Sequence, residues 1–453
     1  MNVELIRKYN VPGPRYTSYP TVPYWDKTGI ELNDWESSVQ NIYAKDKEYG
    51  LSIYIHLPFC EALCTFCACH KHITKRKEVQ DPYIATLIKE WKLYRKLLDE
   101  KPLIKEIHLG GGTPTFFSPE HLKQLIEAVT EGCDIADEYE FSFEGHPNNT
   151  TKEHLQALYD VGFRRVSFGV QDYDPIVQLA INRVQPYENV KQVHEWSKEI
   201  GYTSISHDIV FGLPHQKLEG MLETIKLTNE LKPDRLAFYS YAHVPWIKGV
   251  GSRGYDEKDL PSNEEKRALY EEGKKALEAN GYIEIGMDHF ALDSDNLYQH
   301  YKEEKLHRNF MGYTTNNTKL MIGLGMSSIS DSWTGFAQNV KTVKEYQELV
   351  DQGIIPIFRG HKLNKEDLII RQHILEIMCH FRTNWERTDE NSVFFDEINT
   401  RLESFADDEL MYFEDNMLIV REKGKPFVRN ICMAFDLKLN RHKPTTRLFS
   451  QTI

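Results

Sequence analysis

The chain has 453 residues, of which 40% are hydrophobic and 27% are charged, and its formal net charge at pH 7 is −13. This length is enough for a large catalytic domain with appended segments, and the acidic balance argues against a general nucleic-acid surface. No apolar run reaches membrane-spanning length and Met1–Trp25 lacks a signal-peptide pattern. We therefore expect a cytoplasmic, monomeric protein without nucleic-acid or membrane partners.

Residues 1–36 are predicted to form an N-terminal arm without regular structure. Prolines interrupt this segment at Pro12, Pro14, Pro20 and Pro23, and tyrosines lie between them. The stretch Gly13–Thr21 reads GPRYTSYPT and places Arg15 among aromatic side chains. Two interpretations are open: an arm packed on the body, as is common for chain termini, or a lid over a flat ligand.

A buried strand followed by closely spaced cysteines comes next. Cys60, Cys64 and Cys67 form C-x-x-x-C-x-x-C, and Cys69 follows. Three thiolates on one loop can bind three irons of a four-iron cluster and leave the fourth iron open. A structural zinc site is the weaker alternative because it usually needs two C-x-x-C pairs or Cys with His, and the other cysteines are isolated. A disulfide framework is weaker still in a long chain without a secretory segment.

The cysteine spacing, with Phe66 just before the third cysteine, resembles that of the radical S-adenosylmethionine (SAM) enzymes. By this resemblance, SAM chelates the open iron, and an electron from the reduced cluster cleaves it to a 5'-deoxyadenosyl radical. The cofactor carries that chemistry, and the protein supplies position and exclusion of water.

From residue 51 to about 290, short apolar strands alternate with amphipathic helices. The expected strands are 51–57, 104–109, 139–144, 165–170, 205–211, 235–242 and 282–288, and the helices include Asp81–Leu98 and Pro119–Val129. Repeated strand and helix predict an α/β fold with parallel strands and right-handed crossovers, which we interpret as a partial (β/α)6-type barrel. We assign residues 37–360 to this catalytic domain.

The unusual residues fall where the strands end. The cysteines follow the first strand, the segment Gly110–Thr115 (GGGTPT) the second, Glu144 ends the third, Gln171 ends the fourth, Asp208 lies in the fifth and Tyr241–His243 end the sixth. Catalytic groups of a (β/α) barrel gather at the carboxyl ends of its strands. The sequence therefore predicts that these residues share one rim.

Each of these residues also has a simpler explanation. The glycines could form only a tight turn, but three in succession also let a ligand approach the backbone closely, and we favour ligand contact. Glu144 and Asp208 lie in apolar strands where an unpaired carboxylate is costly, and a ribose diol or a sulfonium is a suitable partner. Arg183 could cap the preceding helix or pair with such a carboxylate, and Gln171 could serve only the backbone.

The last third of the chain departs from the alternation. His307–Thr315 and Leu320–Ser330 are expected to add strands or a loop near the site, with His307 and Arg308 beside Phe310 able to hold an anion. Residues 361–453 are predicted to form a mainly helical domain of winged-helix outline. Its last 33 residues, Arg421–Ile453, carry eight basic against two acidic side chains, either as a salt-bridged docking face or as an edge for an acidic ligand.

Across nearly its whole length the chain resembles the oxygen-independent coproporphyrinogen III oxidases. The resemblance rests on motifs that are distributed from the arm to the C-terminal segment: GPRYTSYPT, YIHLPFCEALCTFCAC, HLGGGTPT, GVQDY, DIVFGLP, YAHVP, GMDHFA, HRNF with GYTT, and RNICMAFD. The cysteine motif identifies only the superfamily, whereas the arm, Cys69, HRNF and RNIC narrow it to this family.

The resemblance implies coproporphyrinogen III, a macrocycle with four propionates, as the substrate. The adenosyl radical would abstract a β-hydrogen from a propionate, and the substrate radical would then lose carbon dioxide and one electron to give a vinyl group. Two such events, on rings A and B, give protoporphyrinogen IX and consume two SAM molecules in haem biosynthesis. The electron donor and the terminal acceptor are not identified by the sequence.

The resemblance also carries roles to individual residues. Cys60, Cys64 and Cys67 would bind the [4Fe-4S] cluster, and Glu144 and Phe310 would be catalytic. The first SAM site maps to Tyr54, Gly111, Glu144, Ala242 and Ile329, and the second to Phe66, Gly112, Thr113, Gln171, Arg183 and Asp208. Cys69 has no ligand role in the three-cysteine scheme.

Two positions differ from the family pattern. Met311 stands where the family often has Gln, and Gly145-His146 stand where Val-Asp is common.

For the propionates, we hypothesise that Arg15, Arg308 and Arg441 are the partners. Two other functions remain alternatives: a related haem chaperone, which by resemblance lacks the fourth cysteine and usually the arm, and a radical SAM methyltransferase that opens the haem ring.

Overall fold

A curved sheet of parallel strands forms the centre of the computed structural model, which describes residues 3–26, 29–246, 253–444, 446 and 448–452. The inner strands lie in the order β1, β4, β5, β6, β7, β8, and each pairs in parallel with the next. Their bounds are Leu51–Leu57, Leu103–Gly111, Asp134–Gly145, Arg165–Gln171, Ser204–Phe211 and Arg235–Ser240. The predicted α/β class and the parallel (β/α)6 arrangement are confirmed.

Strands of both directions extend this sheet at its two edges, so that it has 12 strands within the described residues. Beside β1 lies β13 (Met321–Leu324), which is also parallel, followed by the antiparallel strands β14 (Ile329–Asp331), β15 (Gly335–Asn339) and β16 (Ile357–Lys362). Beside β8 lie β10 (His289–Ala291) and then β9 (Ile283–Gly286). The sequence prediction of residues 282–288 as the next strand of the alternation was wrong in this respect, because the chain reverses at Asp288, whose φ is 67°, and β9 pairs only with the antiparallel β10 among the described strands.

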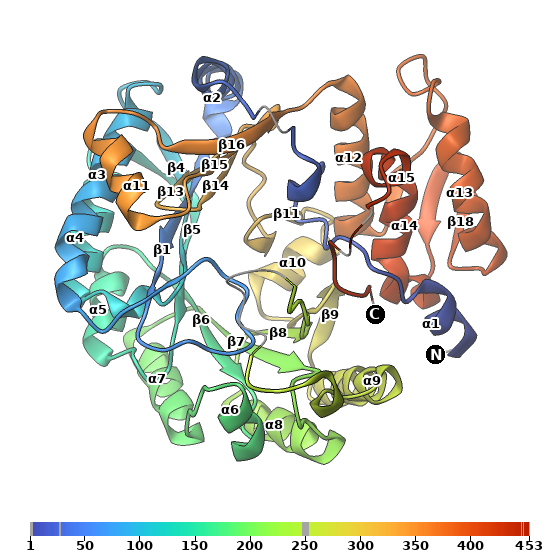
Figure 1. The fold of residues 1–453 in the computed structure, drawn as a ribbon, viewed down its shortest axis with the longest axis horizontal. Coiled ribbons are helices and arrows are strands. Elements are labelled where there is room, and N and C mark those ends of the chain that lie inside the picture. The colour runs from blue at the N-terminus through green and yellow to red at the C-terminus, as the bar shows by residue number, and fades with distance from the viewer. Residues whose placement is uncertain (1–2, 27–28, 247–252, 445, 447, 453) are drawn as a thin grey trace.

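Helices pack on the outer face of the sheet and enclose its parallel part (Figure 1). They are α3 (Gln80–Arg95), α4 (Pro119–Thr130), α5 (Lys152–Asp160), α6 (Pro175–Ala180), α7 (Tyr187–Ile200), α8 (Leu218–Leu231) and α9 (Asn263–Ala279), with α10 (Asn296–Lys302) and α11 (Val343–Asp351) further along the chain. The predicted start of α4 is confirmed, because the Ser118 hydroxyl accepts a hydrogen bond from the backbone N–H of His121.

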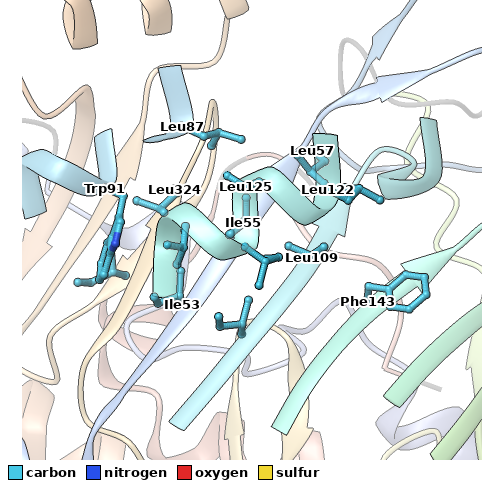
Figure 2. Packing of buried hydrophobic residues seen from close by; sticks show 14 of the residues in the cluster. Ile53, Ile55, Leu57, Leu87, Trp91, Leu109, Leu122, Leu125, Phe143 and Leu324 are labelled. Carbon is cyan, nitrogen blue, oxygen red and sulfur yellow. The ribbon is translucent and has the colours of Figure 1, made fainter. Parts of the chain in front are cut away.

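The main core lies between the sheet and these helices. Figure 2 shows Ile53 and Ile55 of β1 beside Leu109 of β4, with Leu122 and Leu125 of α4 packed over them. These side chains are fully buried, and truncating one of them to alanine costs about 2–5 kcal/mol. This core holds the strand ends, and therefore the loops that follow them, in fixed positions.

One buried carboxylate ties α3 to the edge of the sheet. Glu90 accepts hydrogen bonds from the backbone N–H of Gly325 (2.7 Å), the Asn339 amide (2.7 Å) and the Tyr346 hydroxyl (2.6 Å). Its side chain is completely buried. Because a buried carboxylate is tolerated only with such partners, this contact fixes the loop after β13 against the helix layer.

The N-terminal arm is more regular than its prolines indicate. Val3–Tyr9 form helix α1, since every arm proline comes after Tyr9, and α2 begins at Leu32 and runs to Asp46. Tyr9, Tyr16 and Tyr19 are buried in one hydrophobic cluster with residues of the C-terminal segment. Arg429 donates hydrogen bonds to the carbonyl oxygens of Gly13, Pro14, Gln451 and Thr452, which joins the two ends of the chain.

The C-terminal segment is mainly helical, as expected. It contains α12 (Lys365–His380), α13 (Phe395–Asp407), α14 (Val428–Phe435) and α15 (Leu437–Arg441), with a small sheet of β17 (Arg382–Asn384), β18 (Met411–Glu414) and β19 (Met417–Val420). These helices lie together at one side of the barrel (Figure 1). The division at residues 36 and 360 stays a prediction. Within the described residues, no helix is both long and apolar enough to cross a membrane.

Candidate active site

The cysteine loop leaves the barrel at the end of β1 and is held by backbone contacts. It is framed by the short strands β2 (Phe59–Cys60) and β3 (His72–Ile73), which pair in parallel. The Asn182 amide donates to the carbonyl oxygen of Leu63 (2.7 Å), and the Thr65 hydroxyl donates to that of Ala180 (3.0 Å). The loop is therefore anchored to the residues that follow β6, across the rim.

The thiols of Cys60, Cys64, Cys67 and Cys69 line one cavity of about 480 Å³ at this rim. A hydrogen bond with Cys69, assisted by the charge of Lys71, lowers the pKa of Cys67 to about 6. Lys71 also donates to the carbonyl oxygens of Cys67 (3.1 Å) and Cys69 (3.2 Å). Burial raises the pKa of Cys60 to about 11, and a bound metal would favour its thiolate.

The donor set fits a cluster better than a single ion. In the described part of the chain, no three Cys, His, Asp or Glu side chains converge closely enough to hold one metal ion. A zinc site needs its sulfur atoms about 2.3 Å from the metal, at the corners of one tetrahedron. Three thiols on the wall of a cavity of about 480 Å³ suit three corners of a four-iron cluster.

The glycine loop packs directly under the cysteine loop. A Cβ atom at Gly112 would come 2.5 Å from the carbonyl oxygen of Pro58, and one at Gly111, whose φ is 111°, would come 2.6 Å from the His56 ring. The Thr113 hydroxyl donates to the Cys60 sulfur at 3.4 Å. The glycines are thus consistent with both a tight turn and ligand contact, because they permit this close packing and also line the cavity.

Glu144 points into the same cavity from the end of β5. Its carboxylate lies 3.3 Å from the backbone nitrogen of Gly111 and 3.6 Å from the Nε2 atom of His108. Burial alone would raise the pKa of Glu144, but the bonds to His108 and to the Gly111 N–H outweigh it and hold the pKa below its ordinary value. With 49% of its side chain exposed, this carboxylate is charged and open to a cationic ligand.

Three further predicted residues line the same cavity: Gln171, Arg183 and Asp208. Asp208 accepts a hydrogen bond from Ser167 (2.9 Å), and burial raises its pKa to about 6. Arg183 donates to the Gly169 carbonyl oxygen at 2.7 Å and lies 3.9 Å from the Cys64 sulfur. Its buried Nε atom has no hydrogen-bond partner among the described residues, which leaves it available to a ligand. Phe66, from the cysteine loop, lines the same cavity.

The remaining predicted site residues lie outside the described wall of this cavity. Tyr54 is behind it, with its hydroxyl 3.0 Å from Nδ1 of His56. Ala242 is half-buried beyond β8. Phe310 and Ile329 pack in a separate hydrophobic cluster with Trp25 and Phe336, and the Phe310 and Phe336 rings meet edge to face.

A second cavity of about 290 Å³ lies deeper in the barrel and shares Glu144, Asp208 and Tyr239 with the first. Arg15 of the arm and Arg308 of β11 (His307–Asn309) line it, as does Met311. At its floor, Arg165 and Arg235 are paired with Glu140 and Asp295. The sequence reasoning missed Tyr239, Asp288 and His146, although strand-end positions and the quoted GMDHFA motif contain signals for the first two.

The hypothesis that Arg441 faces the same anions was wrong. Arg441 donates to Glu366 on α12 and to Glu397 on α13, so it joins helices of the C-terminal segment. The Lys438–Asp367 and Lys423–Glu409 ion pairs lie on the same segment. Lys423, Lys438 and Arg441 thus fit the salt-bridged docking face, the commoner of the two interpretations, whereas Arg429 donates to carbonyl oxygens.

Comparison with known proteins agrees with this geometry. The sequence model of the Radical SAM superfamily matches residues 54–228, the part that carries the cysteine loop and the strand ends. Fold and site together define a radical SAM protein, with a fold that implies a [4Fe-4S] cluster and SAM.

Relatives of full length define the family more closely. The oxygen-independent coproporphyrinogen III oxidases of Synechocystis and of Escherichia coli K12 are each 36% identical to this chain, covering 100% of it and 98% of their own length. The solved structure of the Escherichia coli coproporphyrinogen III oxidase, described as a radical SAM enzyme, superposes with a TM-score of 0.88 at 35% identity, covering 96% of this chain and 98% of that one. The chain belongs to the oxygen-independent coproporphyrinogen III oxidase family.

Proposed function

We propose that the protein decarboxylates the ring A and ring B propionates of coproporphyrinogen III to vinyl groups and so forms protoporphyrinogen IX. The observation that carries the proposal is the pair of cavities that meet at Glu144, Asp208 and Tyr239. One is lined by thiols and carboxylates that suit a cluster and a sulfonium, and the other by arginines that suit a polycarboxylate.

In this proposal, Cys60, Cys64 and Cys67 hold the cluster, and Glu144 neutralises the amino group of SAM from the opposite side. When bound, the cluster and SAM supply the radical that removes a β-hydrogen from the propionate. Loss of carbon dioxide and of one further electron then completes each vinyl group, so a reductant must feed the cluster and an acceptor must take the last electron. We also propose a monomer that works in the cytoplasm.

A second SAM is proposed beside the first. Gly112, Thr113, Gln171, Arg183 and Asp208 line the same cavity as the cysteines. The unpartnered Nε atom of Arg183 suits a carboxylate, and Asp208 suits a ribose diol. The cavity, of about 480 Å³, lies in the size range of sites that bind ligands of this class.

The roles given to Tyr54, Ala242, Phe310 and Ile329 stay proposals that rest on family resemblance. Phe310 contacts Trp25 of the arm, with ring centroids 6.5 Å apart. Since Arg308 lies two residues earlier on the same hairpin and faces the inner cavity, Phe310 connects the arm with that wall. It would contribute by closing the site to water around a reactive radical.

The test is anaerobic turnover. The reconstituted protein is given SAM, a low-potential reductant and coproporphyrinogen III, and vinyl product and 5'-deoxyadenosine are quantified. The proposal expects vinyl product with about two deoxyadenosines per macrocycle, because each propionate requires one radical. Deoxyadenosine without vinyl product, from a protein that retains b-type haem, would instead support a haem chaperone, and open-chain tetrapyrroles would support the ring-opening methyltransferase.

A further inference from the structure

Arg308 is a buried cation whose charge is left without a carboxylate partner among the described residues. Its side chain is on β11, in a hairpin with β12 (Gly312–Thr314), and only 6% of the residue is exposed. The guanidinium lies over the Tyr313 ring, 4.6 Å from the ring centroid. Its Nη2 atom donates to the carbonyl oxygen of Arg15 at 3.5 Å, while Nε and Nη1 have no hydrogen-bond partner in the described structure.

The other arginines of the same cavity are satisfied. Arg235 donates to Asp295 at 2.7 Å, and Arg165 donates to Glu140 at 3.0 Å. Arg15 donates to Asp288 at 3.0 Å and to the Ser240 carbonyl oxygen at 3.1 Å. A buried arginine with two idle donor positions is costly, and the cost is removed when an anion binds. Arg308 therefore marks a place prepared for an anionic group.

Several cations gather around Arg308. Arg15, Lys266 and Arg429 influence the same region, and Asp288 is the acid nearest to them. Lys266 and Arg429 donate to carbonyl oxygens. Glu144 and Asp208 line the inner cavity as well, so an anion is expected where the cations gather, at Arg308 and Arg15.

His289 and Met311 do not compete with the arginines for an anion. Burial, together with the charge of Arg308, lowers the pKa of His289 to about 4, and the ring lies 2.8 Å from the Met287 carbonyl oxygen through Nδ1. Met311 adds a thioether to the wall where the family often has an amide. The recognition of an anion in this cavity thus falls to arginine.

We propose that Arg308, assisted by Arg15, binds a propionate carboxylate of the substrate and thereby sets which face of the macrocycle meets the radical. This deepens the proposed function and rests on it for the identity of the ligand. A guanidinium with two free N–H directions matches the two oxygens of a carboxylate. Asp288 pairs with Arg15 of the arm, and on substrate binding the propionate carboxylate would share Arg15 with Asp288.

The experiment measures binding of coproporphyrin III, the stable oxidised form of the macrocycle, to the reconstituted full-length protein under anaerobic conditions. Arg308→Gln is expected to weaken binding about 10- to 100-fold, the range of a charge-assisted hydrogen bond, and Arg308→Lys is expected to recover part of it. Arg441→Gln, which alters an arginine outside both cavities, is the matched control and is expected to bind like wild type.

A neutral analogue separates charge recognition from shape. The tetra-amide of coproporphyrin III is expected to bind wild type and Arg308→Gln equally, because the amides cannot use the guanidinium charge. SAM affinity is expected to be equal in both proteins. Equal coproporphyrin III affinity in wild type and Arg308→Gln would overturn the inference, as would a loss of SAM affinity alone, since the SAM carboxylate would then be the occupant.

Stability provides an independent readout. Replacement of a buried, unpartnered cation by an apolar side chain of similar length relieves desolvation, so Arg308→Met is expected to raise the melting temperature of the ligand-free protein by about 2 °C. A clear decrease would assign Arg308 a structural role and refute the inference. If wild type binds coproporphyrin III through Arg308 but forms no vinyl product, the proposed function fails while the binding site stands.

Discussion

Replacement of Glu144 by Gln tests the arrangement of the first SAM site. The substitution removes one negative charge but keeps an oxygen for the backbone N–H of Gly111, 3.3 Å away. Its other neighbour, His108, is 3.6 Å away, which is longer than a strong ion pair. Few internal contacts therefore depend on the charge of Glu144, and the melting temperature of the variant is expected to stay within about 2 °C of wild type.

The effect on SAM affinity is expected to be larger. A charge-assisted hydrogen bond contributes about 1.5–3 kcal/mol when both groups are desolvated. Because 49% of the Glu144 side chain is exposed in the ligand-free cavity, we take the lower end of that range. About 1.5 kcal/mol corresponds to roughly a tenfold increase in the dissociation constant of SAM.

Anaerobic titration calorimetry with SAM measures this constant, and iron and sulfide analysis verifies that the cluster is intact. Glu61→Gln is the matched control, since Glu61 lines the same cavity but is paired with Lys77 at 2.8 Å. The control is expected to bind SAM within about twofold of wild type. A Glu144→Gln protein with a full cluster and wild-type SAM affinity would refute the role of this carboxylate.

Three further predictions concern the cluster, the core and the pH dependence of stability. Cys64→Ala is expected to lose most cluster iron by elemental analysis, whereas Cys133→Ala, which lies outside the cavity wall, keeps the wild-type content; equal iron in both would contradict the three-thiol scheme. Glu90→Ala leaves its three buried donors without an acceptor and is expected to cost about 3–5 kcal/mol, seen as a melting temperature several degrees lower than that of Lys89→Ala, the exposed neighbour. Since the folded-state pKa of Asp208 is raised to about 6 from 3.8, its ionisation destabilises the fold as pH rises through that range; Asp208→Asn is therefore expected to gain melting temperature relative to wild type at pH 7 but not at pH 4, and a constant difference would contradict this sign.

The parallel core could be predicted from sequence because its signals are local. Strand β1 has aliphatic residues at every second position, and α4 has both a serine cap and a following proline. Elements that depend on contacts between distant parts of the chain were harder to predict. The strand β13 is short and lies more than two hundred residues from β1 in the chain, yet the two pair in parallel, and no local pattern encodes that neighbour.

The residues of the first cavity could also be predicted from sequence, because they follow or lie in predicted strands. Cys60, Gln171 and Asp208 come together because parallel strands place their carboxyl ends at one rim. The partners of the arginines could not be predicted, since Arg15, Arg308 and Arg441 carry the same charge in the sequence. Only the fold shows that Arg441 has two carboxylate partners and that Arg308 has idle donors in a cavity.

The bonds from Arg429 to both chain ends couple two segments that are far apart in the sequence. One side chain of α14 holds four backbone carbonyl oxygens, two in the arm and two in the C-terminal segment. Because Arg429 is buried, the loss of its guanidinium would leave those oxygens without this donor and would ease local opening of both segments. The arm and the C-terminal segment therefore open or stay closed as one unit, and a change at either one reaches the other through Arg429.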